Sequence, residues 1–418
     1  MFARLSRSPT DASAPGSSKS TYDSRLVRVL VVHNEYRSEM PSGENQVVAA
    51  EAEMLTRAGI AVDLYSRSSD EIEGFGLVQR AALPVRPIFS LEDTRAIRRR
   101  IRETRPDVVH LHNPFPLISP WVIRVAKNEG VPVVQTVHNY RHSCPAGDFF
   151  RNGAPCEDCS GKALPWPAVV HGCYRGSRPQ SAVMAAAARV HRATWLMVDR
   201  FLPVSEFVAG HLVKSGIPRE RITVRPNSAE PRGPVRPLGS GFLFVGRLTD
   251  EKGASLLISA WTQSDVGRDE RLVVVGDGPE RDLVLAASGH NVRYEGTVDR
   301  ARVSTLLDEA AIVVIPSLCY EGFPRLVAES FERGRPVAAT ALGALRELIT
   351  PDVGWTAPAE PLAFARMLAT AVSDPSLAQK GASARATYDA TLTPAATLAS
   401  LLDVYAAVGA GRSGRAGT

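Results

Sequence analysis

Short apolar runs alternate with amphipathic segments along most of the chain. Leu26–His33 is an almost continuous apolar run, which is typical of a strand buried on both faces of a parallel sheet. Helical periodicity follows over Gly43–Gly59, where the last glycine suits a C-cap. A second apolar run covers Ile60–Ser66. Strands that alternate with helices predict parallel sheets with helices on both faces.

A segment rich in proline and glycine, Asn227–Gly241, separates two such series and is the best linker candidate. An irregular stretch at about 140–178 breaks the first series, and the second starts at Phe242. We therefore expect an N-terminal domain over 25–230 with this insertion, a C-terminal domain over 238–393, and a last helix over 394–410 that returns to the N-terminal domain. Residues 1–24 and 411–418 read as disordered tails. Ligands of doubly wound sheets bind beyond the carboxyl ends of the strands, so the cleft between the domains is the predicted site.

Composition and charge agree with a globular α/β protein. The 418 residues are 44% hydrophobic and 22% charged, and the net charge of +5 suits anionic ligands or an anionic surface without requiring either. No run reaches the roughly 18 apolar residues of a membrane-spanning helix. The first residues hold no apolar segment of a secretory signal. We expect a cytoplasmic protein, in which disulfides are disfavoured.

The familiar nucleotide fingerprints are incomplete in this chain. Gly276 and Gly278 follow a predicted strand, but Arg281 stands where a dinucleotide fingerprint would have its third glycine. No P-loop pattern of the GxxxxGK[ST] type is present either. Hydride transfer and nucleoside triphosphate hydrolysis are therefore disfavoured.

Two short segments suit an anionic ligand. In "FVGRLTDEKG", Arg247 and Lys252 follow a predicted strand, where a guanidinium and an ammonium can hold a diphosphate. Two solvated basic side chains at a surface turn explain that pattern equally well. Gly43, in "PSGENQ", opens a helix whose N–H groups and dipole favour an anion. A plain N-cap is the simpler interpretation there.

A third segment, "YEGFPRLVAES", holds two glutamates. Pro324 suits the first turn of a helix, so Glu321 is expected in the loop before it and Glu329 more than one turn inside. Glu329 stands among apolar residues, where an inward carboxylate needs a donor such as a pair of hydroxyls. A hydrolase acid–base pair is the rival interpretation. The eight residues would span roughly 12 Å of helix, which is long for such a pair.

Together these segments resemble a known family. "GRLTDEKG", "VVVGDGPE" and "YEGFPRLVAE" are similar to the C-terminal domain of retaining GT-B glycosyltransferases of the family 4 type, in which Glu321 and Glu329 would form the E-x7-E element. "SGENQVVAAEAEMLTRAGIAVDLYS", "RPDVVHLHNP", "TVHN" and "FLPVSEFVAGHLVKSGIPRERITVRPNSAE" resemble its N-terminal half. The resemblance runs from about Leu26 to Val408. It implies the GT-B fold of two Rossmann-like domains and transfer of a sugar, with retained anomeric configuration, from a nucleotide diphosphate donor.

The resemblance also implies roles for single residues. Arg247 and Lys252 would bind the donor diphosphate in place of a metal. The sequence has no Asp-x-Asp motif at a strand end, so it does not indicate a metal-dependent donor site. Glu329 would bind the ribose hydroxyls and Glu321 the donor sugar, while His138 would face that sugar across the cleft. The other expected donor contacts are Gly43, Gly246, Gly276, Gly322, Phe323, Pro324 and Leu326. The expected donor is a UDP- or GDP-sugar, and the acceptor is a saccharide, a lipid-linked molecule or a small molecule.

Two positions depart from the family pattern. Ser42-Gly43 stands where two glycines are common, which leaves the path of that loop open. Asn139, in "TVHN", replaces the commoner aspartate and is therefore not read as a base. A non-catalytic nucleotide-sugar-binding protein of the same fold is the rival hypothesis, and the intact donor-side residues favour an enzyme. An epimerase or a phosphorylase of this fold is a third hypothesis, and the sequence gives no support for the cofactor lysine that a phosphorylase would usually need.

Four of the five cysteines fall in the irregular stretch. "CEDC" gives Cys156 and Cys159 a C-x2-C spacing, and Cys144 and Cys173 flank this pair. In a cytosolic protein the pattern predicts a structural zinc site. Free thiols, a redox pair, two disulfides or an iron–sulfur cluster are the alternatives. Cys319 suits a packed small residue.

The same stretch directly follows His138 and should lie at the mouth of the cleft, on the acceptor side. Arg141 and His142 are therefore candidate acceptor contacts. Elsewhere, "RAIRRRIRETR" gathers six arginines that could dock on anionic lipid. A solvated helix face explains them at least as well. No aromatic platform accompanies the charge, so nucleic acid is not an expected partner.

Overall fold

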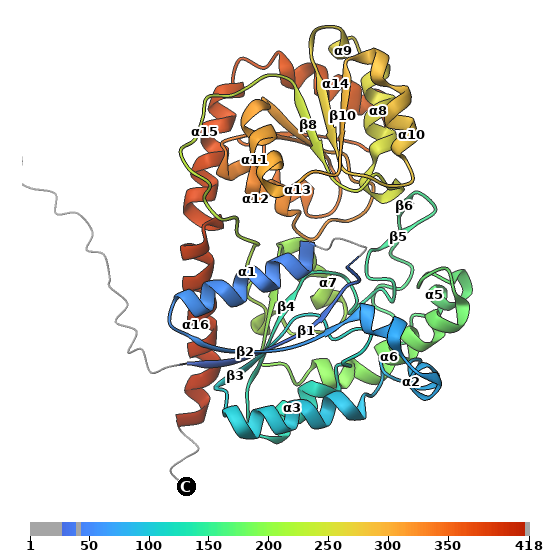
Figure 1. Ribbon diagram of the computed structural model, residues 1–418, viewed down its shortest axis with the longest axis vertical. Helices are drawn as coiled ribbons and strands as arrows, with labels where there is room; N and C mark the ends of the chain where they lie inside the picture. Colours follow the sequence, from blue (N-terminus) through green and yellow to red (C-terminus); the bar gives the residue numbers. More distant parts are fainter. Residues whose placement is uncertain (1–26, 39–42, 414–418) are drawn as a thin grey trace, which may run out of the picture.

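The computed structural model describes residues 27–38 and 43–413 and shows two α/β domains, one above the other in Figure 1. The expected tail over 1–24 and the position of Ser42 lie outside the described residues. At the other end, the last helix continues to Ser413 rather than stopping at 410, and 414–418 lie outside the description.

The N-terminal domain is built on a five-stranded parallel sheet in the order β2-β1-β3-β4-β7. Its strands are β1 (Arg28–Glu35), β2 (Ala61–Ser68), β3 (Val108–Leu111), β4 (Val133–Val137) and β7 (Arg200–Pro203). Val29 and Val31 of β1 pack toward the helices α1 (Gly43–Arg57) and α16 (Pro394–Ser413), whereas Leu30 and Val32 join the core on the opposite face. This double burial explains the continuous apolar run in the sequence.

The other elements of this domain are helices and one hairpin. Serines cap several of the helices: Ser90, Ser177 and Ser205 each accept from a backbone N–H in the first turn. The helices are α2 (Leu77–Ala82), α3 (Leu91–Thr104), α4 (Trp121–Asn128), α5 (Trp166–His171), α6 (Arg178–Trp195) and α7 (Glu206–Lys214), with 3-10 turns η1 (Ser69–Gly74) and η2 (Arg219–Arg221). The irregular stretch of the sequence holds a small antiparallel hairpin of β5 (Phe150–Arg151) and β6 (Ala154–Pro155), followed by α5.

The C-terminal domain has a six-stranded parallel sheet in the order β10-β9-β8-β11-β12-β13. Its strands are β8 (Phe242–Val245), β9 (Leu272–Val275), β10 (Val292–Gly296), β11 (Ile312–Ile315), β12 (Val337–Thr340) and β13 (Gly354–Ala357). Its helices are α8 (Ala254–Thr262), α9 (Val266–Asp269), α10 (Arg281–Ala286), α11 (Arg300–Glu309), α12 (Arg325–Glu332), α13 (Leu345–Leu348) and α14 (Pro361–Val372), with 3-10 turns η3 (Asp250–Lys252) and η4 (Ser288–His290). Two parallel sheets with helices between their strands confirm the doubly wound architecture.

The chain returns to the N-terminal domain at its end. Helix α15 (Leu377–Thr387), the π-helical turn η5 (Tyr388–Leu392) and α16 form one red column along both domains in Figure 1. By length and composition alone, the helical run Leu377–Gly409 could cross a membrane, with a mean hydropathy of 1.3. Its residues Leu401, Val404 and Tyr405 are instead buried against the N-terminal sheet. Packing on the core thus covers part of this helix, and 28% of its most apolar window is buried.

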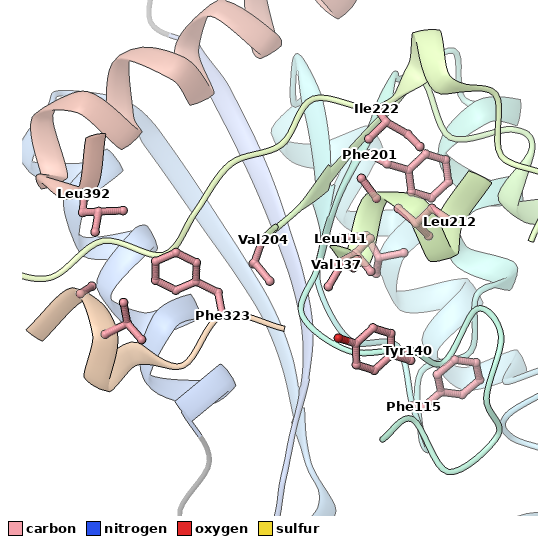
Figure 2. Packing of buried hydrophobic residues seen from close by; sticks show 14 of the residues in the cluster. Leu111, Phe115, Val137, Tyr140, Phe201, Val204, Leu212, Ile222, Phe323 and Leu392 are labelled. Atoms are coloured by element: carbon pink, nitrogen blue, oxygen red, sulfur yellow. The ribbon is translucent and has the colours of Figure 1, made fainter. Parts of the chain in front are cut away.

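One hydrophobic cluster joins the two domains. It includes Val137 and Val204, which end strands of the N-terminal sheet, and Phe323 and Val327 from the C-terminal domain. Figure 2 shows Phe323 and Val204 approaching each other where the domains meet, with Tyr140 nearby. The loop before α12 is thus held against the N-terminal domain by apolar packing as well as by polar contacts.

Candidate functional site

A cleft of about 290 Å³ lies between the two sheets. The chain reaches it wherever a strand ends: His138 follows β4, Gly246 follows β8 and Ser317 follows β11. Of the predicted donor and catalytic residues, those lining the cleft are Gly43, His138, Gly246, Lys252, Glu321, Phe323, Pro324 and Leu326. Parallel strands bring their carboxyl ends to one edge, which is why residues so far apart in sequence meet here.

Lys252 and Glu321 form a half-buried ion pair in the cleft. Lys252 Nζ lies 2.6 Å from Glu321 Oε1, and Ser317 Oγ donates to the same oxygen at 2.7 Å. Burial disfavours both charges, but the attraction between the two groups is the stronger effect. The pKa of Lys252 is therefore raised and the pKa of Glu321 is lowered. The cleft therefore holds a fixed ammonium and a fixed carboxylate. Ser317 was not singled out in the sequence, although its place after a buried strand was visible there.

Arg247 lies beside the cleft and does not line it. Its side chain is 43% exposed and pairs with Glu251 at 3.0 Å. The sequence correctly predicted that Arg247 follows β8. Its flexible side chain, four residues before Glu251, pairs with that glutamate at the surface. A ligand phosphate would have to draw the guanidinium away from Glu251.

Glu329 points along its own helix, where Arg325 NH2 donates to Glu329 Oε1 at 3.1 Å. Arg325 itself lines the cleft and also contacts Gln46 of α1, so it bridges the two domains. Glu329 is not among the cleft-lining residues. The sequence did not single out Arg325, although the i,i+4 spacing of the two charges was a signal for their pairing.

Two of the predicted donor glycines serve close packing instead of lining the cleft. Gly276 has φ +127°, and a Cβ there would lie 1.8 Å from the carbonyl oxygen of Gly246. A Cβ at Gly322 would lie 3.0 Å from the carbonyl oxygen of His138 across the domain boundary. Gly276 needs glycine because another backbone lies too close for a side chain, whereas at Gly322 the neighbouring backbone would have to shift by only a few tenths of an ångström.

Polar contacts from the N-terminal domain and the linker hold the loop before α12. Tyr140 donates its hydroxyl to the carbonyl oxygen of Glu321 at 3.0 Å. Asn227 Nδ2 donates to the carbonyl oxygen of Phe323 at 3.1 Å. These two bonds orient the backbone beside the Lys252–Glu321 pair, and neither residue could be assigned that role from local sequence.

His138 ends a buried chain of polar groups. Its Nε2 lies 3.0 Å from His112 Nδ1, and His112 Nε2 lies 3.3 Å from Glu51 Oε1. Because a carboxylate only accepts, we place the His112 proton on Nε2, which makes His112 Nδ1 the acceptor. His138 then carries its proton on Nε2, and its Nδ1 keeps a lone pair.

Glu51 is the charged centre of this chain. Burial alone would raise the pKa of Glu51, but Arg225 and His110 hold it well below its ordinary value. The oxygens and nitrogens of Glu51, His110 and His112 lie within 4.8 Å of one another, a spacing that a metal ion could use. His110 is already engaged on both sides, by Tyr405 Oη at 2.7 Å and Thr136 Oγ1 at 2.8 Å. With Arg225 on the carboxylate as well, the cluster reads as a structural network.

The predicted acceptor contacts face a smaller cavity beside His138. Arg141 and His142 line this second space of about 10 Å³ together with Glu44 and Asn139, and neither lines the main cleft. Arg141 donates to the carbonyl oxygen of Pro145 at 3.2 Å, and the His142 ring packs on Trp195. The turn of the insertion itself holds both side chains away from the main cleft.

Asn139 has a role that an aspartate could not fill. Its Nδ2 donates to Glu44 Oε2 at 3.2 Å, and the Tyr36 hydroxyl donates to the same oxygen at 3.2 Å. Burial raises the pKa of Glu44 in spite of these donors. An aspartate at 139 would place a second carboxylate against Glu44. Asparagine at this position, which departs from the family pattern, instead donates a hydrogen bond to Glu44.

The four cysteines of the insertion surround one cavity, and Cys319 does not line it. All five cysteines are free thiols. Burial raises the pKa of Cys144 and raises that of Cys159 to about 11. Metal-free thiols with these pKa values stay protonated at neutral pH, which is unlike a reactive redox pair.

Acidification is expected to weaken the fold through the buried histidines. Burial lowers the pKa of His33 to about 3 and of His110 to about 4, and takes that of His138 well below 6.5. Below pH 6.5 the unfolded chain binds protons that the native chain does not. The free energy of unfolding should therefore fall as the pH is lowered. Each of these histidines should contribute about 1.4 kcal/mol per pH unit.

Urea unfolding at about pH 7 and about pH 5.5 measures this dependence. His138→Asn should reduce it by roughly one proton. Equal pH dependence in the His138 variant and the wild type would show that His138 titrates normally.

Comparison with known proteins agrees with this geometry. Residues 42–228 match the family model "Glycosyl transferase 4-like domain", and residues 239–374 match "Glycosyl transferases group 1". The chain is 27% identical over 340 residues to the phosphatidyl-myo-inositol mannosyltransferase of Mycobacterium leprae, covering 78% of this chain and 82% of that one. It is 37% identical over 136 residues to a GDP-mannose-dependent alpha-(1-6)-phosphatidylinositol dimannoside mannosyltransferase of Mycobacterium tuberculosis, covering 32% and 35%.

Solved structures show the same fold. Alr3699/HepE of Anabaena, in complex with UDP, superimposes with a TM-score of 0.61 at 15% identity and covers 91% of this chain and 100% of that one. The two domain models follow each other in the order that the sequence motifs predicted, and the two sheets are those of GT-B proteins. The chain thus belongs to the group 1 glycosyltransferases with a glycosyltransferase 4-like N-terminal domain, and it is a nucleotide-sugar-dependent enzyme of the GT-B fold.

Proposed function

We propose that the protein is a retaining glycosyltransferase that moves a sugar from a UDP- or GDP-sugar without a metal at the donor site. The observation that carries this proposal is the Lys252–Glu321 pair at the carboxyl ends of the C-terminal strands, inside the interdomain cleft. It supplies a cation for the leaving group and a carboxylate for the sugar in one rigid unit.

Lys252 carries the electrostatic part of the reaction. Negative charge grows on the nucleotide diphosphate as the glycosidic bond breaks, and a fixed ammonium stabilises that charge without reorganisation. Arg247 adds a second cation once the diphosphate draws it from Glu251. Gly43, at the start of α1, lets the helix N-terminus approach the phosphates from the other domain.

Glu321 and His138 would hold the sugar from opposite domains. Glu321 is ionised, and its second oxygen is available to accept from sugar hydroxyls while Lys252 and Ser317 hold the first. The lone pair on His138 Nδ1 accepts in the same way. Glu329, with Arg325 beside it, would contact the ribose when the nucleotide enters.

Retention of configuration without a covalent intermediate agrees with the contacts of Glu321. This carboxylate is held by an ammonium and a hydroxyl, which lowers its nucleophilicity, so we assign it no covalent step. The acceptor hydroxyl would instead attack from the face that the diphosphate leaves.

The relatives support a broad choice of donor and acceptor. A structural neighbour binds UDP, and one relative is named as using GDP-mannose. Both mycobacterial relatives are named for phosphatidylinositol-based acceptors. We propose a saccharide, lipid-linked or small-molecule acceptor that enters the main cleft, because the space of about 10 Å³ that Arg141 and His142 line is too small to receive it.

Contact with an anionic membrane surface is a further part of the proposal, with the enzyme at the cytoplasmic face. Three exposed arginines on α3 or at its C-cap form no ion pair within the described residues, whereas Arg100 pairs with Asp63, and Arg98 and Arg102 pair with Glu129. The free arginines are Arg95, Arg99 and Arg105. Sedimentation with anionic vesicles tests the contact, and equal binding by a variant without these three side chains would refute it.

A panel of UDP- and GDP-sugars tests the activity. Wild-type protein should form a glycosylated product from one donor, whose anomeric configuration is read by NMR. Glu321→Ala and Arg247→Ala should each lower turnover, whereas Arg268→Ala, which removes an 80% exposed side chain, should not. Undiminished turnover in both site variants would refute the site assignment, and donor binding without turnover would favour a non-catalytic nucleotide-sugar-binding protein. An inverted product would refute the retaining mechanism alone.

A further inference from the structure

The insertion between β4 and α6 brings four distant thiols to one place. Cys144, Cys156, Cys159 and Cys173 all line a cavity of about 10 Å³, together with Phe149 and Ala168. Cys144 and Cys159 are buried, and the other two are half-buried. The first and the last thiol are 29 positions apart, so only the fold of the insertion makes them neighbours.

Each thiol sits on its own short turn or helix end. Cys144 N–H donates to the carbonyl oxygen of Tyr140 at 2.7 Å, and Cys156 N–H donates to that of Phe149 at 2.7 Å. Cys173 N–H donates to the carbonyl oxygen of Ala168 at 3.0 Å. These bonds fix the directions of three Cα–Cβ vectors before any ligand binds. Preorganised backbone of this kind is what a metal site in an irregular segment requires.

Burial raises the pKa of Cys144 and Cys159, and polar groups around the thiols oppose that effect. Backbone N–H groups of Ala146, Gly147 and Phe149 lie close to the Cys144 sulfur, and that of Ala168 lies close to the Cys159 sulfur. Arg151, on the hairpin, pairs with Asp158 at 2.8 Å and places positive charge beside Cys156 and Cys173. Four thiolates around a divalent ion carry a net negative charge, so these dipoles and this cation stabilise the loaded site.

The ligand type selects the metal. Four sulfur ligands suit zinc in a closed tetrahedral site, and Asp158, which also lines the cavity, is paired with Arg151. The sulfurs form no group of three as tight as the 4.8 Å cluster of Glu51, His110 and His112. Tetrahedral zinc holds its sulfurs at about 2.3 Å from the ion, and hence roughly 3.8 Å apart. Binding would therefore draw the Cys156–Cys159 turn inward.

The insertion also touches the donor side of the cleft. The Tyr140 ring packs on Phe149 at 4.9 Å, and the Tyr140 hydroxyl holds the backbone of Glu321. Phe149 lies 6.3 Å from Tyr320, between ring centroids, in the same donor loop. Gly153, at the tip of the hairpin, approaches the Asp250 carboxylate of η3. Phe149 directly precedes β5 and lines the thiol cavity, so a metal there would support the loop that carries Glu321.

We propose that Cys144, Cys156, Cys159 and Cys173 bind one structural zinc ion, which stiffens the insertion and through Tyr140 and Phe149 steadies the donor loop. On binding, zinc replaces the thiol protons, which pass to solvent, and no electron is transferred. The inference stands on the insertion alone and does not depend on the proposed transfer reaction.

Metal analysis of the full chain, purified with reductant and without chelator, tests the proposal. We expect one zinc per chain, released by a mercurial that titrates the thiols, and cobalt in its place should give the absorption of tetrahedral thiolate ligation. Cys156→Ser should lose the metal, whereas Cys319→Ala, the matched control outside the cavity, should keep it. If the serine variant fails to fold, the stoichiometry and cobalt spectrum of the wild type still decide the ligands.

Several outcomes would overturn the proposal. These are a folded chain without metal in which the four thiols are free or disulfide-bonded, iron with inorganic sulfide in place of zinc, or equal zinc in Cys156→Ser and the wild type. Hydrogen exchange tests the mechanical part: removal of zinc should speed exchange in both 140–178 and 317–324. Faster exchange in the insertion alone would refute the support of the donor loop.

Discussion

Replacing Lys252 by methionine should lower kcat by about 100- to 1,000-fold with a smaller change in the KM for the donor. The methionine keeps most of the side-chain volume but removes the ammonium that faces the cleft 2.6 Å from Glu321. Because the lost charge interacts most strongly with the leaving diphosphate, its removal raises the barrier more than it weakens ground-state binding. Steady-state kinetics with the donor found in the panel measures the effect.

A matched control distinguishes a loss of catalysis from the effects of a changed net charge or of misfolding. Lys162→Met removes an exposed lysine from the surface of the insertion and should leave kcat unchanged. The double variant Lys252→Met with Glu321→Gln also removes the carboxylate that the first change leaves without its ammonium. If kcat of Lys252→Met stays within about threefold of the wild type, Lys252 does not stabilise the leaving group.

Glu51→Ala should destabilise the N-terminal domain by about 3–5 kcal/mol, which is typical of breaking a buried ion pair. The side chains of Glu51 and Arg225 are 4% and 6% exposed, so the variant leaves a guanidinium buried without its carboxylate. It also removes the charge beside His110 and His112. Urea unfolding followed by tryptophan fluorescence measures the free energy of unfolding.

Glu53→Ala is the control on the same helix. Glu53 is 69% exposed and pairs only loosely with Arg57 at 3.6 Å, so its loss should change stability by less than about 0.5 kcal/mol. The double variant Glu51→Ala with Arg225→Met should cost less than the sum of the single changes, because the two residues share one interaction. A cost for Glu51→Ala as small as that for Glu53→Ala would contradict the buried network.

Much of the fold could be predicted from local patterns. Runs such as Val29–Val32 are apolar because both faces of the sheet are covered. Such continuous apolar runs can be recognised from the sequence alone. The places where strands end were visible too, so Gly246, Lys252 and Glu321 could be assigned to one edge. Pro324 marked the start of α12, and the structure caps the helix at that residue.

The orientation of long side chains could not be predicted in this way. Arg247 and Glu329 were expected in the donor site, yet Arg247 pairs with Glu251, and Glu329 pairs with Arg325. Charged side chains choose among several partners within reach, and differences of about 1 kcal/mol decide the choice. Gly276 was expected as a donor contact because it follows a strand, but backbone packing behind Gly246 explains it.

The sequence by itself determined the two doubly wound domains, their order and the family, since these follow from periodicity and from short motifs. Only the tertiary structure decided how the parts are held together. Glu51 meets Arg225 across 174 positions, Tyr405 meets His110 across 295, and Tyr140 supports Glu321 across 181. No local pattern encodes such pairs, because each depends on how the chain closes back on itself after the strands and helices have formed.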